Sequence, residues 1–174
     1  MSEASLPSLS RDRCFWGMTT TQFLGAFNDN LFKQLVLLYC LTEVGEEGGD
    51  YQPVAFFLFS IPFVFGSGFS GFLADRYSKR SVIIIVKFME VMIGIMALVG
   101  FLMGNLWVLI AALVLISIQS TFFSPAKYGI LPEIIEEKLL SRANGTLSMF
   151  TYVACILGIG AAGPLYDLYI SKTF

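Results

Sequence analysis

The sequence predicts an all-α membrane protein with about five transmembrane helices. Hydrophobic residues make up 56% of the 174 residues, whereas charged residues make up only 14%. An ordinary soluble domain carries roughly 25% charged residues. The apolar residues also gather in five long segments, each close to the ~20 residues that a helix needs to cross a bilayer. These observations argue against a soluble domain, and a net charge of −2 gives no reason to expect a nucleic-acid partner.

The five segments differ in character along the chain. After a tail over residues 1–14, the first is longer than a span requires and is polar in its middle, and the second is rich in Phe. The fifth combines small residues with Pro164, a pattern typical of close helix packing. The predicted helices cover residues 15–42, 53–74, 81–104, 105–123 and 145–168.

The segment over residues 130–142 differs from the membrane spans. Its apolar side chains recur at helical spacing against a charged face, and Pro132 suits the first turn of a helix. The pattern predicts an amphipathic helix that lies on the cytoplasmic surface of the membrane.

Lysine and arginine placement predicts the orientation. With a cytoplasmic N-terminus, eight cations fall on the cytoplasmic side: Arg11, Arg13, Arg76, Lys79, Arg80, Lys127, Lys138 and Arg142. The opposite side has only Lys172, and its first loop, residues 43–50, contains four acids and no cation. The positive-inside rule therefore places the N-terminus in the cytoplasm and Phe174 outside.

The first segment contains the strongest candidate site, around Asp29. A helix that starts near Phe15 places Asp29 about 20 Å along its axis, near mid-membrane. A carboxylate at that depth is costly and indicates a functional site. Lys33, one turn later, is its predicted partner. The same face carries Thr19, Gln22 and Ala26, and the candidates for substrate binding or ion coupling are Asn28, Asp29, Asn30 and Lys33. A purely structural ion pair between helices is the alternative.

The third segment carries a second pair of charges. Lys87 and Glu90 are three residues apart and share a helix face. Lys87 is close enough to the membrane surface for its ammonium to reach it, whereas Glu90 lies deeper. Glu90 is therefore a further ion-coupling candidate or a buried structural partner.

Metal and disulfide chemistry receive no support from the sequence. The chain has no histidine, and Cys14, Cys40 and Cys155 are widely spaced. We expect no bound metal or cofactor apart from a coupling cation, Na⁺ or H⁺.

The loop between the second and third segments predicts a gate. Gly71, Asp75, Arg76 and Arg80 combine small size, a helix-capping acid and cations that can reach acids or phosphates. Lys79 and Arg80 can alternatively act only as topological anchors. Residues 71–80 resemble the signature loop between helices 2 and 3 of the major facilitator superfamily, except that Ser78 stands where glycine is usual.

Two further stretches narrow the resemblance. Residues 23–33 and 124–133 resemble the lysophospholipid transporter branch of that superfamily. The resemblance implies that residues 15–174 form most of the N-terminal six-helix half of a secondary active transporter. That transporter would move lysophospholipid across the bacterial cytoplasmic membrane for reacylation. It also implies that Lys127 and Tyr128 lie at the cytoplasmic mouth of the fourth helix. Besides membrane lipids, the implied partners are a C-terminal half and a fused or associated acyltransferase.

Three other functions stay open. A proton-coupled small-molecule efflux transporter would share the fold, the loop and the buried carboxylate. The chain could be the membrane half of an acyltransferase fusion, in which case any enzymatic activity would lie beyond Phe174. An inactive truncated membrane scaffold is the third alternative.

Overall fold

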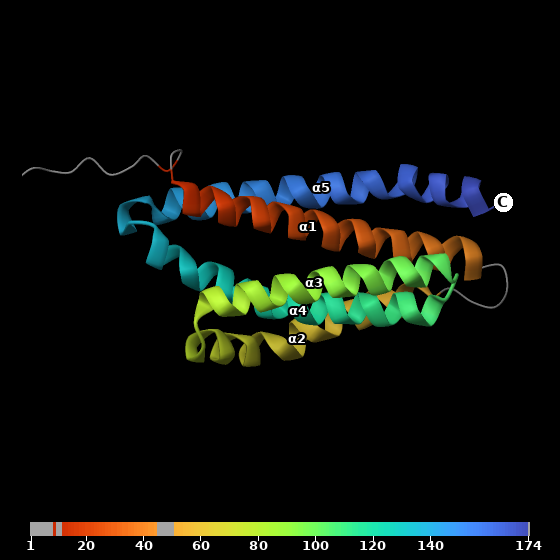
Figure 1. Cartoon of the computed structure of the whole chain (residues 1–174), viewed down its shortest axis with the longest axis horizontal. Coiled ribbons are helices and arrows are strands. Elements are labelled where there is room, and N and C mark those ends of the chain that lie inside the picture. Colours follow the sequence, from red (N-terminus) through yellow and green to blue (C-terminus); the bar gives the residue numbers. More distant parts are fainter. Residues whose placement is uncertain (1–8, 10–11, 45–50, 174) are drawn as a thin grey trace, which may run out of the picture.

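The computed structural model shows a bundle of five long helices and describes residue 9, residues 12–44 and residues 51–173 (Figure 1). The helices are α1 (Arg13–Tyr39), α2 (Gln52–Arg76), α3 (Lys79–Leu102), α4 (Leu106–Ile134) and α5 (Leu140–Thr173). A π-helical turn, Cys40–Val44, follows α1, and a 3-10 turn, Glu137–Leu139, precedes α5. The described ranges contain no strand, so the predicted all-α class is confirmed.

The helices alternate in direction. α1, α3 and α5 run one way and α2 and α4 the other, so the start of α1 and the α2–α3 and α4–α5 connections lie at the same end (Figure 1, left). We call this the cationic end because it carries Arg13, Arg76, Lys79, Arg80, Lys138 and Arg142.

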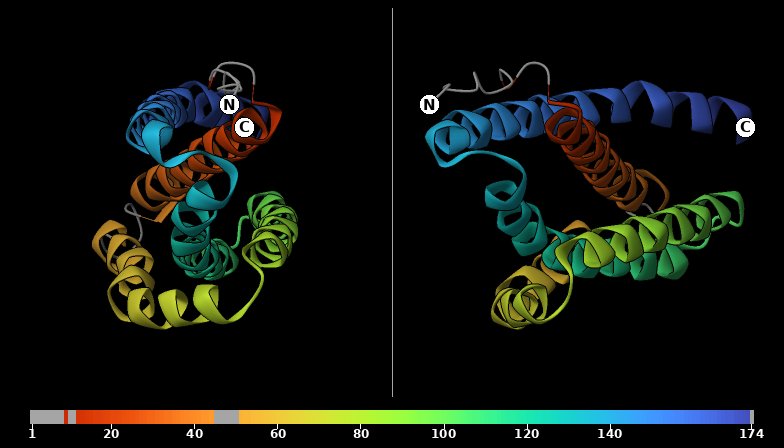
Figure 2. Two further views of the ribbon diagram at one scale, coloured as in Figure 1. Left: turned by 90° about the vertical axis from the view of Figure 1, so that its left-hand side faces the viewer. Right: turned by 60° about the vertical axis from the view of Figure 1, so that its left-hand side comes forward.

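The bundle has two main packing groups. α1 lies along α5, and α4 packs between α2 and α3 (Figure 2). α1 and α4 also contact each other and join the two groups. Since α1 and α4 occupy the middle of the bundle, their polar residues face its interior.

Three described helices, α3, α4 and α5, are long and apolar enough to cross a membrane. The start of α2 forms a shorter apolar helix, Gln52–Gly66. The middle of α1 carries Asp29 and Lys33 together with several polar residues, which lower its mean hydropathy. α1 nevertheless lies alongside α5 over most of its length (Figure 1).

The structure corrects two predicted features at the end of α4. The helix does not end at residue 123 but continues through Pro125 and Pro132 to Ile134. A proline removes one backbone hydrogen bond, which a packed membrane helix can tolerate. No separate amphipathic helix covers residues 130–142, because Leu131 and Ile135 are buried against Phe15 of α1 and Leu147 of α5. The apolar face that predicted surface binding packs inside the protein instead.

The α3–α4 turn is held by local hydrogen bonds. Gly104 has a φ of +60°, a conformation that favours glycine. Asn105 caps α4 by accepting hydrogen bonds from the backbone amides of Trp107 and Val108. The Tyr39 hydroxyl donates to the Gly104 carbonyl at 2.8 Å, which fixes the turn against the end of α1.

Two apolar clusters enclose a polar middle layer. The larger cluster, away from the cationic end, includes Phe32, Val36, Tyr39, Ile93, Leu109, Leu113, Ile116 and Tyr166. The smaller cluster, at the cationic end, comprises Leu9, Phe15, Leu131, Ile135, Ala143 and Leu147. The polar residues of α1 and α4 lie between these clusters, near the centre of the helices.

Candidate functional site

A cavity of about 300 Å³ occupies the polar middle layer, and all five helices line it. Most of its polar side chains come from α1 and α4, and α2 contributes aromatic rings. Its lining includes Gln22, Asp29 and Lys33 of α1, Phe59 and Phe63 of α2, Lys87 of α3, Gln119, Ser120 and Lys127 of α4, and Thr151 and Cys155 of α5. We call it the central cavity.

Asp29 is bonded to α4 rather than to its predicted partner. Its Oδ2 accepts a hydrogen bond of 2.5 Å from the Ser120 hydroxyl. Its Oδ1 is buried and has no hydrogen-bond partner among the described residues. The predicted pair with Lys33 is wrong: the Lys33 ammonium donates to Asn30 Oδ1 at 3.1 Å and lies 5.3 Å from the Phe59 ring centroid. Asp29 turns toward α4 and Lys33 toward α2, although both line the central cavity.

The two asparagines beside Asp29 face different neighbours. Asn30 Nδ2 donates to the Ala26 carbonyl at 2.8 Å and to Cys155 Sγ of α5 at 3.1 Å. Asn28 instead lines a crevice between α1 and α3. One turn earlier than Ala26, Gln22 donates to the Thr151 hydroxyl of α5 at 3.1 Å. Side-chain hydrogen bonds therefore tie the polar face of α1 to α5.

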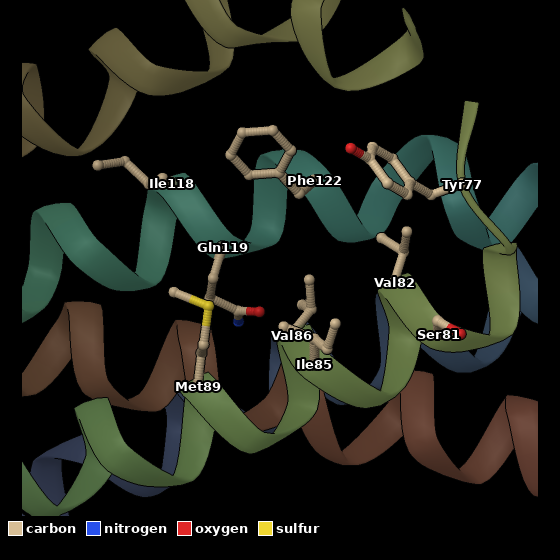
Figure 3. Close-up of a pocket in the computed structure, with 9 residues that line it drawn as sticks. All are labelled: Tyr77, Ser81, Val82, Ile85, Val86, Met89, Ile118, Gln119 and Phe122. Atoms are coloured by element: carbon tan, nitrogen blue, oxygen red, sulfur yellow. The ribbon is translucent and has the colours of Figure 1, made fainter. Parts of the chain in front are cut away.

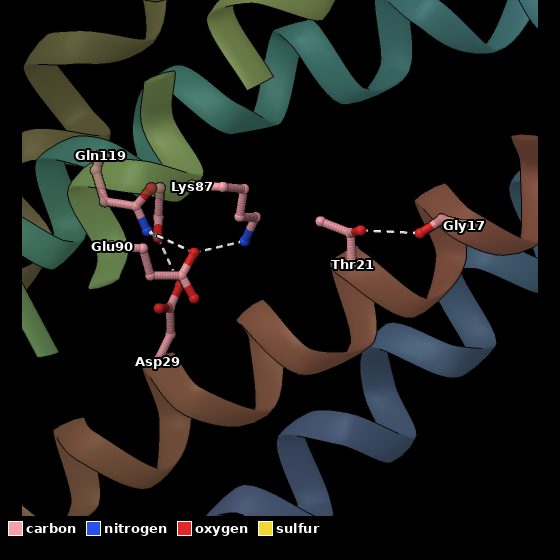
Figure 4. Close-up of polar contacts among 7 residues, drawn as sticks. Gly17, Thr21, Asp29, Lys87, Glu90 and Gln119 are labelled. Atoms are coloured by element: carbon pink, nitrogen blue, oxygen red, sulfur yellow. Dashed lines mark hydrogen bonds and ion pairs between the residues drawn. The ribbon is translucent and has the colours of Figure 1, made fainter. Parts of the chain in front are cut away.

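The predicted pair on α3 is confirmed. The Lys87 ammonium lies 2.5 Å from Glu90 Oε2, and the two side chains are only 23% and 11% exposed. Gln119 Nε2 of α4 also reaches Glu90 Oε2, through a long hydrogen bond of 3.5 Å (Figure 4). The ammonium lies 4.4 Å from the Phe123 ring centroid, a cation–π distance.

Lys127 lies inside the bundle and not at its mouth. The side chain is only 6% exposed, lines the central cavity and has no carboxylate within ion-pair distance in the described part of the chain. Its ammonium lies 4.5 Å from the ring centroid of Tyr128, which is itself exposed. The family resemblance implied that both residues lie at the cytoplasmic mouth of the fourth helix, but α4 continues to Ile134 and Lys127 faces the bundle interior.

The predicted gate residues make few contacts. Arg76 and Arg80 are exposed and form no ion pair within the described ranges, and Gly71 is half-buried. The side chain of Asp75 lies outside the described residues. The sequence also allowed Lys79 to act only as a topological anchor. In the structure Lys79 forms an ion pair with Glu133, which ties α3 to α4 at the cationic end.

Several residues of the central cavity were not predicted, among them Gln119, Ser120 and Cys155. Gln119 and Ser120 are adjacent polar residues in the middle of an otherwise aliphatic segment, and intramembrane polar residues usually face a bundle interior. That signal was available in the sequence. Cys155 carried no comparable signal, because a cysteine in an apolar segment is usually a small packing residue.

An apolar groove of about 430 Å³ opens on the other side of the α3–α4 contact (Figure 3). Val82, Val86 and Met89 line it from α3, and Ile118 and Phe122 from α4. Gln119, which is 2% exposed, lines both this groove and the central cavity. Gln119 therefore lies in the wall that separates the cavity from an apolar surface.

The three cysteines provide a test of this geometry. Cys14 is exposed, Cys40 is buried and Cys155 is intermediate and faces the central cavity. We expect a small polar thiol reagent to modify Cys14 fastest and Cys40 slowest, as followed by mass spectrometry of the chain in lipid nanodiscs. Asn30→Ala should accelerate modification of Cys155 several-fold by freeing its sulfur, without changing the rate at Cys14. A Cys155 that is as inert as Cys40 in both proteins would contradict a hydrated cavity.

Comparisons with known proteins support both the helical membrane fold and the resemblance to a transporter family that the sequence motifs indicated. The family model described as Major Facilitator Superfamily matches residues 18–171. The lysophospholipid transporter LplT of Cronobacter sakazakii is 32% identical over 160 residues, which are 91% of this chain and 38% of that protein. LplT of Escherichia fergusonii is 34% identical over 151 residues, 86% of this chain and 36% of that protein. No solved structure matches.

The chain thus spans less than two fifths of the length of these curated relatives. Its resemblance to the lysophospholipid transporter branch is confirmed at this level of similarity. Since the family model covers residues 18–171, from the second turn of α1 almost to the end of α5, the chain belongs to the Major Facilitator Superfamily.

Proposed function

We propose that this chain forms the N-terminal part of a secondary active transporter that moves lysophospholipid across the bacterial cytoplasmic membrane for reacylation. The names of the relatives suggest the substrate, and the family membership supports transport. The cationic end lies in the cytoplasm in this proposal, because anionic lipid and the positive-inside rule favour it there.

The observation that carries the proposal is a buried lysine without an anionic partner in the part of the chain that the structure describes. Lys127 is only 6% exposed and faces the central cavity, so its ammonium is desolvated with little local compensation. A phosphate supplied by the substrate would provide the missing charge and accept its hydrogen bonds. Within the described residues, Lys33 contacts the neutral Asn30 amide and the Phe59 ring, and in this proposal it is the second hydrogen-bond donor to the phosphate.

Asp29 supplies the opposite charge. Its buried Oδ1 lacks a partner in the described region, so it can accept a proton or coordinate a cation such as Na⁺. Either event would neutralise a buried carboxylate while the substrate enters, which is how a secondary transporter links two fluxes. Asn30, which lines the same cavity, extends the polar surface that a zwitterionic headgroup could contact, whereas Asn28 faces the crevice between α1 and α3.

The gate lies at the cationic end in this proposal. The Lys79–Glu133 ion pair holds α3 to α4. The α2–α3 turn at the same end is flanked by Gly71, Asp75 and Arg76 of α2 and by Arg80 of α3. Such contacts would have to break when the cytoplasmic side opens. Tyr128, the residue after Lys127, is exposed on α4, one position nearer to this end.

The test begins with the native product, detected in its own membranes through an epitope on the N-terminal tail. We would reconstitute that product in proteoliposomes and measure uptake of fluorescent lysophosphatidylethanolamine. The proposal expects uptake that unlabelled lysophosphatidylethanolamine competes away. Uptake of a cationic dye that lysophospholipid does not inhibit would favour a proton-coupled efflux transporter instead, and a product without either activity would favour a membrane scaffold. A larger native product that reacylates the lipid would identify a fused acyltransferase.

A further inference from the structure

A chain of hydrogen bonds joins the two buried carboxylates of the bundle. Ser120 donates to Asp29 Oδ2 at 2.5 Å, and Gln119 Nε2 lies 3.3 Å from the Ser120 hydroxyl. The same Nε2 lies 3.5 Å from Glu90 Oε2, which pairs with the Lys87 ammonium at 2.5 Å (Figure 4). The contacts run from α1 through α4 to α3.

The α3 end of this series of hydrogen bonds is held in place by close contacts with α1 and α4. The Lys87 ammonium lies against α1 at Gly25, where an added methyl group would collide with it. Phe123 of α4 covers the same ammonium from another side. Because Lys87 and Glu90 are both mostly buried, neither charge is screened well by water, and a change in one would be felt by nearby groups.

We propose that the Lys87–Glu90 pair acts as an internal charge regulator of Asp29, with Gln119 and Ser120 as the bridge. Glu90 and Lys87 are positioning residues here: they need not touch the substrate but set how readily Asp29 takes up a proton or cation. The proposal rests on the coupling role of Asp29 proposed above. It assigns a function to α3, which contributes only Lys87 to the lining of the central cavity.

The other groups around Asp29 complete the electrostatic setting. α2 faces the cavity with Phe59 and Phe63 among its described side chains, so it contributes no charge there. The titratable or charged side chains around Asp29 are Lys33 on α1, Lys87 and Glu90 on α3, Lys127 on α4 and Cys155 on α5. Of these, only Glu90 and Lys87 join Asp29 through a continuous series of the hydrogen bonds found in the described residues.

The proposal predicts shifts of opposite sign. Glu90→Gln leaves the Lys87 ammonium unpaired, which favours the ionised form of Asp29, so protonation should need a lower pH. Lys87→Met leaves the Glu90 carboxylate unpaired, which disfavours a second negative charge, so protonation should occur at a higher pH. Each shift should be on the order of one pH unit. The double variant should return close to the original midpoint, and Lys87→Arg should not move it.

Infrared titration of the chain in lipid bilayers measures this directly and does not require transport. The relevant signal is the carbonyl band of a protonated carboxyl group that disappears in Asp29→Asn. As the matched control, Lys79→Gln and Glu133→Gln remove the other ion pair of the described residues, which links α3 to α4 without a hydrogen-bonded path to Asp29, and should leave the midpoint unchanged. Circular dichroism and gel filtration verify that each variant is folded.

The outcomes separate the two proposals. If no titrating band is lost in Asp29→Asn, the coupling role of Asp29 fails and the regulator proposal fails with it. If the band is lost in Asp29→Asn but both single variants leave its midpoint unchanged, or move it in the same direction, only the regulator proposal is overturned. Opposite shifts that cancel in the double variant support it.

Discussion

Gly158→Val should separate α1 from α5 and destabilise the bundle. A Cβ at Gly158 would lie 2.5 Å from the Phe27 carbonyl oxygen and 3.1 Å from the Leu31 amide nitrogen. Both obstacles are backbone atoms, so they cannot move aside as the end of a flexible side chain can. Overpacking of this kind costs about 1–3 kcal/mol or more, and valine should reach or exceed the upper end of that range.

The effect of Gly158→Val should extend to the candidate site, because hydrogen bonds between side chains of the site also cross the α1–α5 contact. Gln22 and Asn30 of α1 reach Thr151 and Cys155 of α5, both in the turns of α5 that precede Gly158. Moving the helices apart by the width of a side chain would break both bonds. Unfolding by denaturant in detergent micelles, followed by circular dichroism, measures the loss of stability.

Gly160→Ala is the matched control. No atom lies within 4 Å of the position that a Cβ at Gly160 would occupy, apart from its own helix and chain neighbours. Alanine is more favourable than glycine within a helix by about 1 kcal/mol, so this variant should be as stable as the original protein or slightly more so. Equal stability of Gly158→Val and Gly160→Ala would show that the α1–α5 contact is looser than the structure has it.

The helices could be predicted because membrane insertion imposes a simple rule on sequence. A span needs a long apolar run, and such runs are visible without knowledge of their neighbours. The ends of the helices depend on packing and were less predictable. α4 continues past Pro125 because Leu131 and Ile135 find buried partners on α1 and α5, and no local property of residues 124–135 reveals those partners.

The candidate site likewise contains some features that could be predicted from the sequence and others that could not. Asp29 was identifiable from its depth in an apolar segment, and the Lys87–Glu90 pair from its spacing on one helix. The partner of Asp29 could not be identified in this way, because Ser120 is 91 residues away in the sequence. The i,i+4 rule considers only residues of the same helix. Pairing within a helix is a matter of local geometry, whereas pairing between helices depends on their rotation and register.

Asp29→Asn should abolish transport while leaving the protein inserted and folded. The amide cannot exchange a proton at neutral pH and binds a cation far more weakly than a carboxylate does. It has nearly the same shape and can still accept the Ser120 hydrogen bond, so the α1–α4 contact should persist. Uptake of lysophosphatidylethanolamine into proteoliposomes should therefore fall to that of empty vesicles, with an unchanged unfolding midpoint.

Asp167→Asn provides the same chemical change outside the central cavity. Asp167 is an exposed residue of α5 and does not line the cavity, so its variant should transport at the original rate. If both variants lose uptake equally, the loss reflects removal of an acid from a membrane helix and not the site. If Asp29→Asn keeps full uptake, Asp29 is a structural hydrogen-bond acceptor for Ser120, and the coupling group must lie elsewhere in the transporter. A selective loss at Asp29 would locate ion coupling in the α1–α4 contact at the centre of the bundle. There, Asp29 and the Lys127 ammonium, which forms no ion pair with the described residues, line the same cavity.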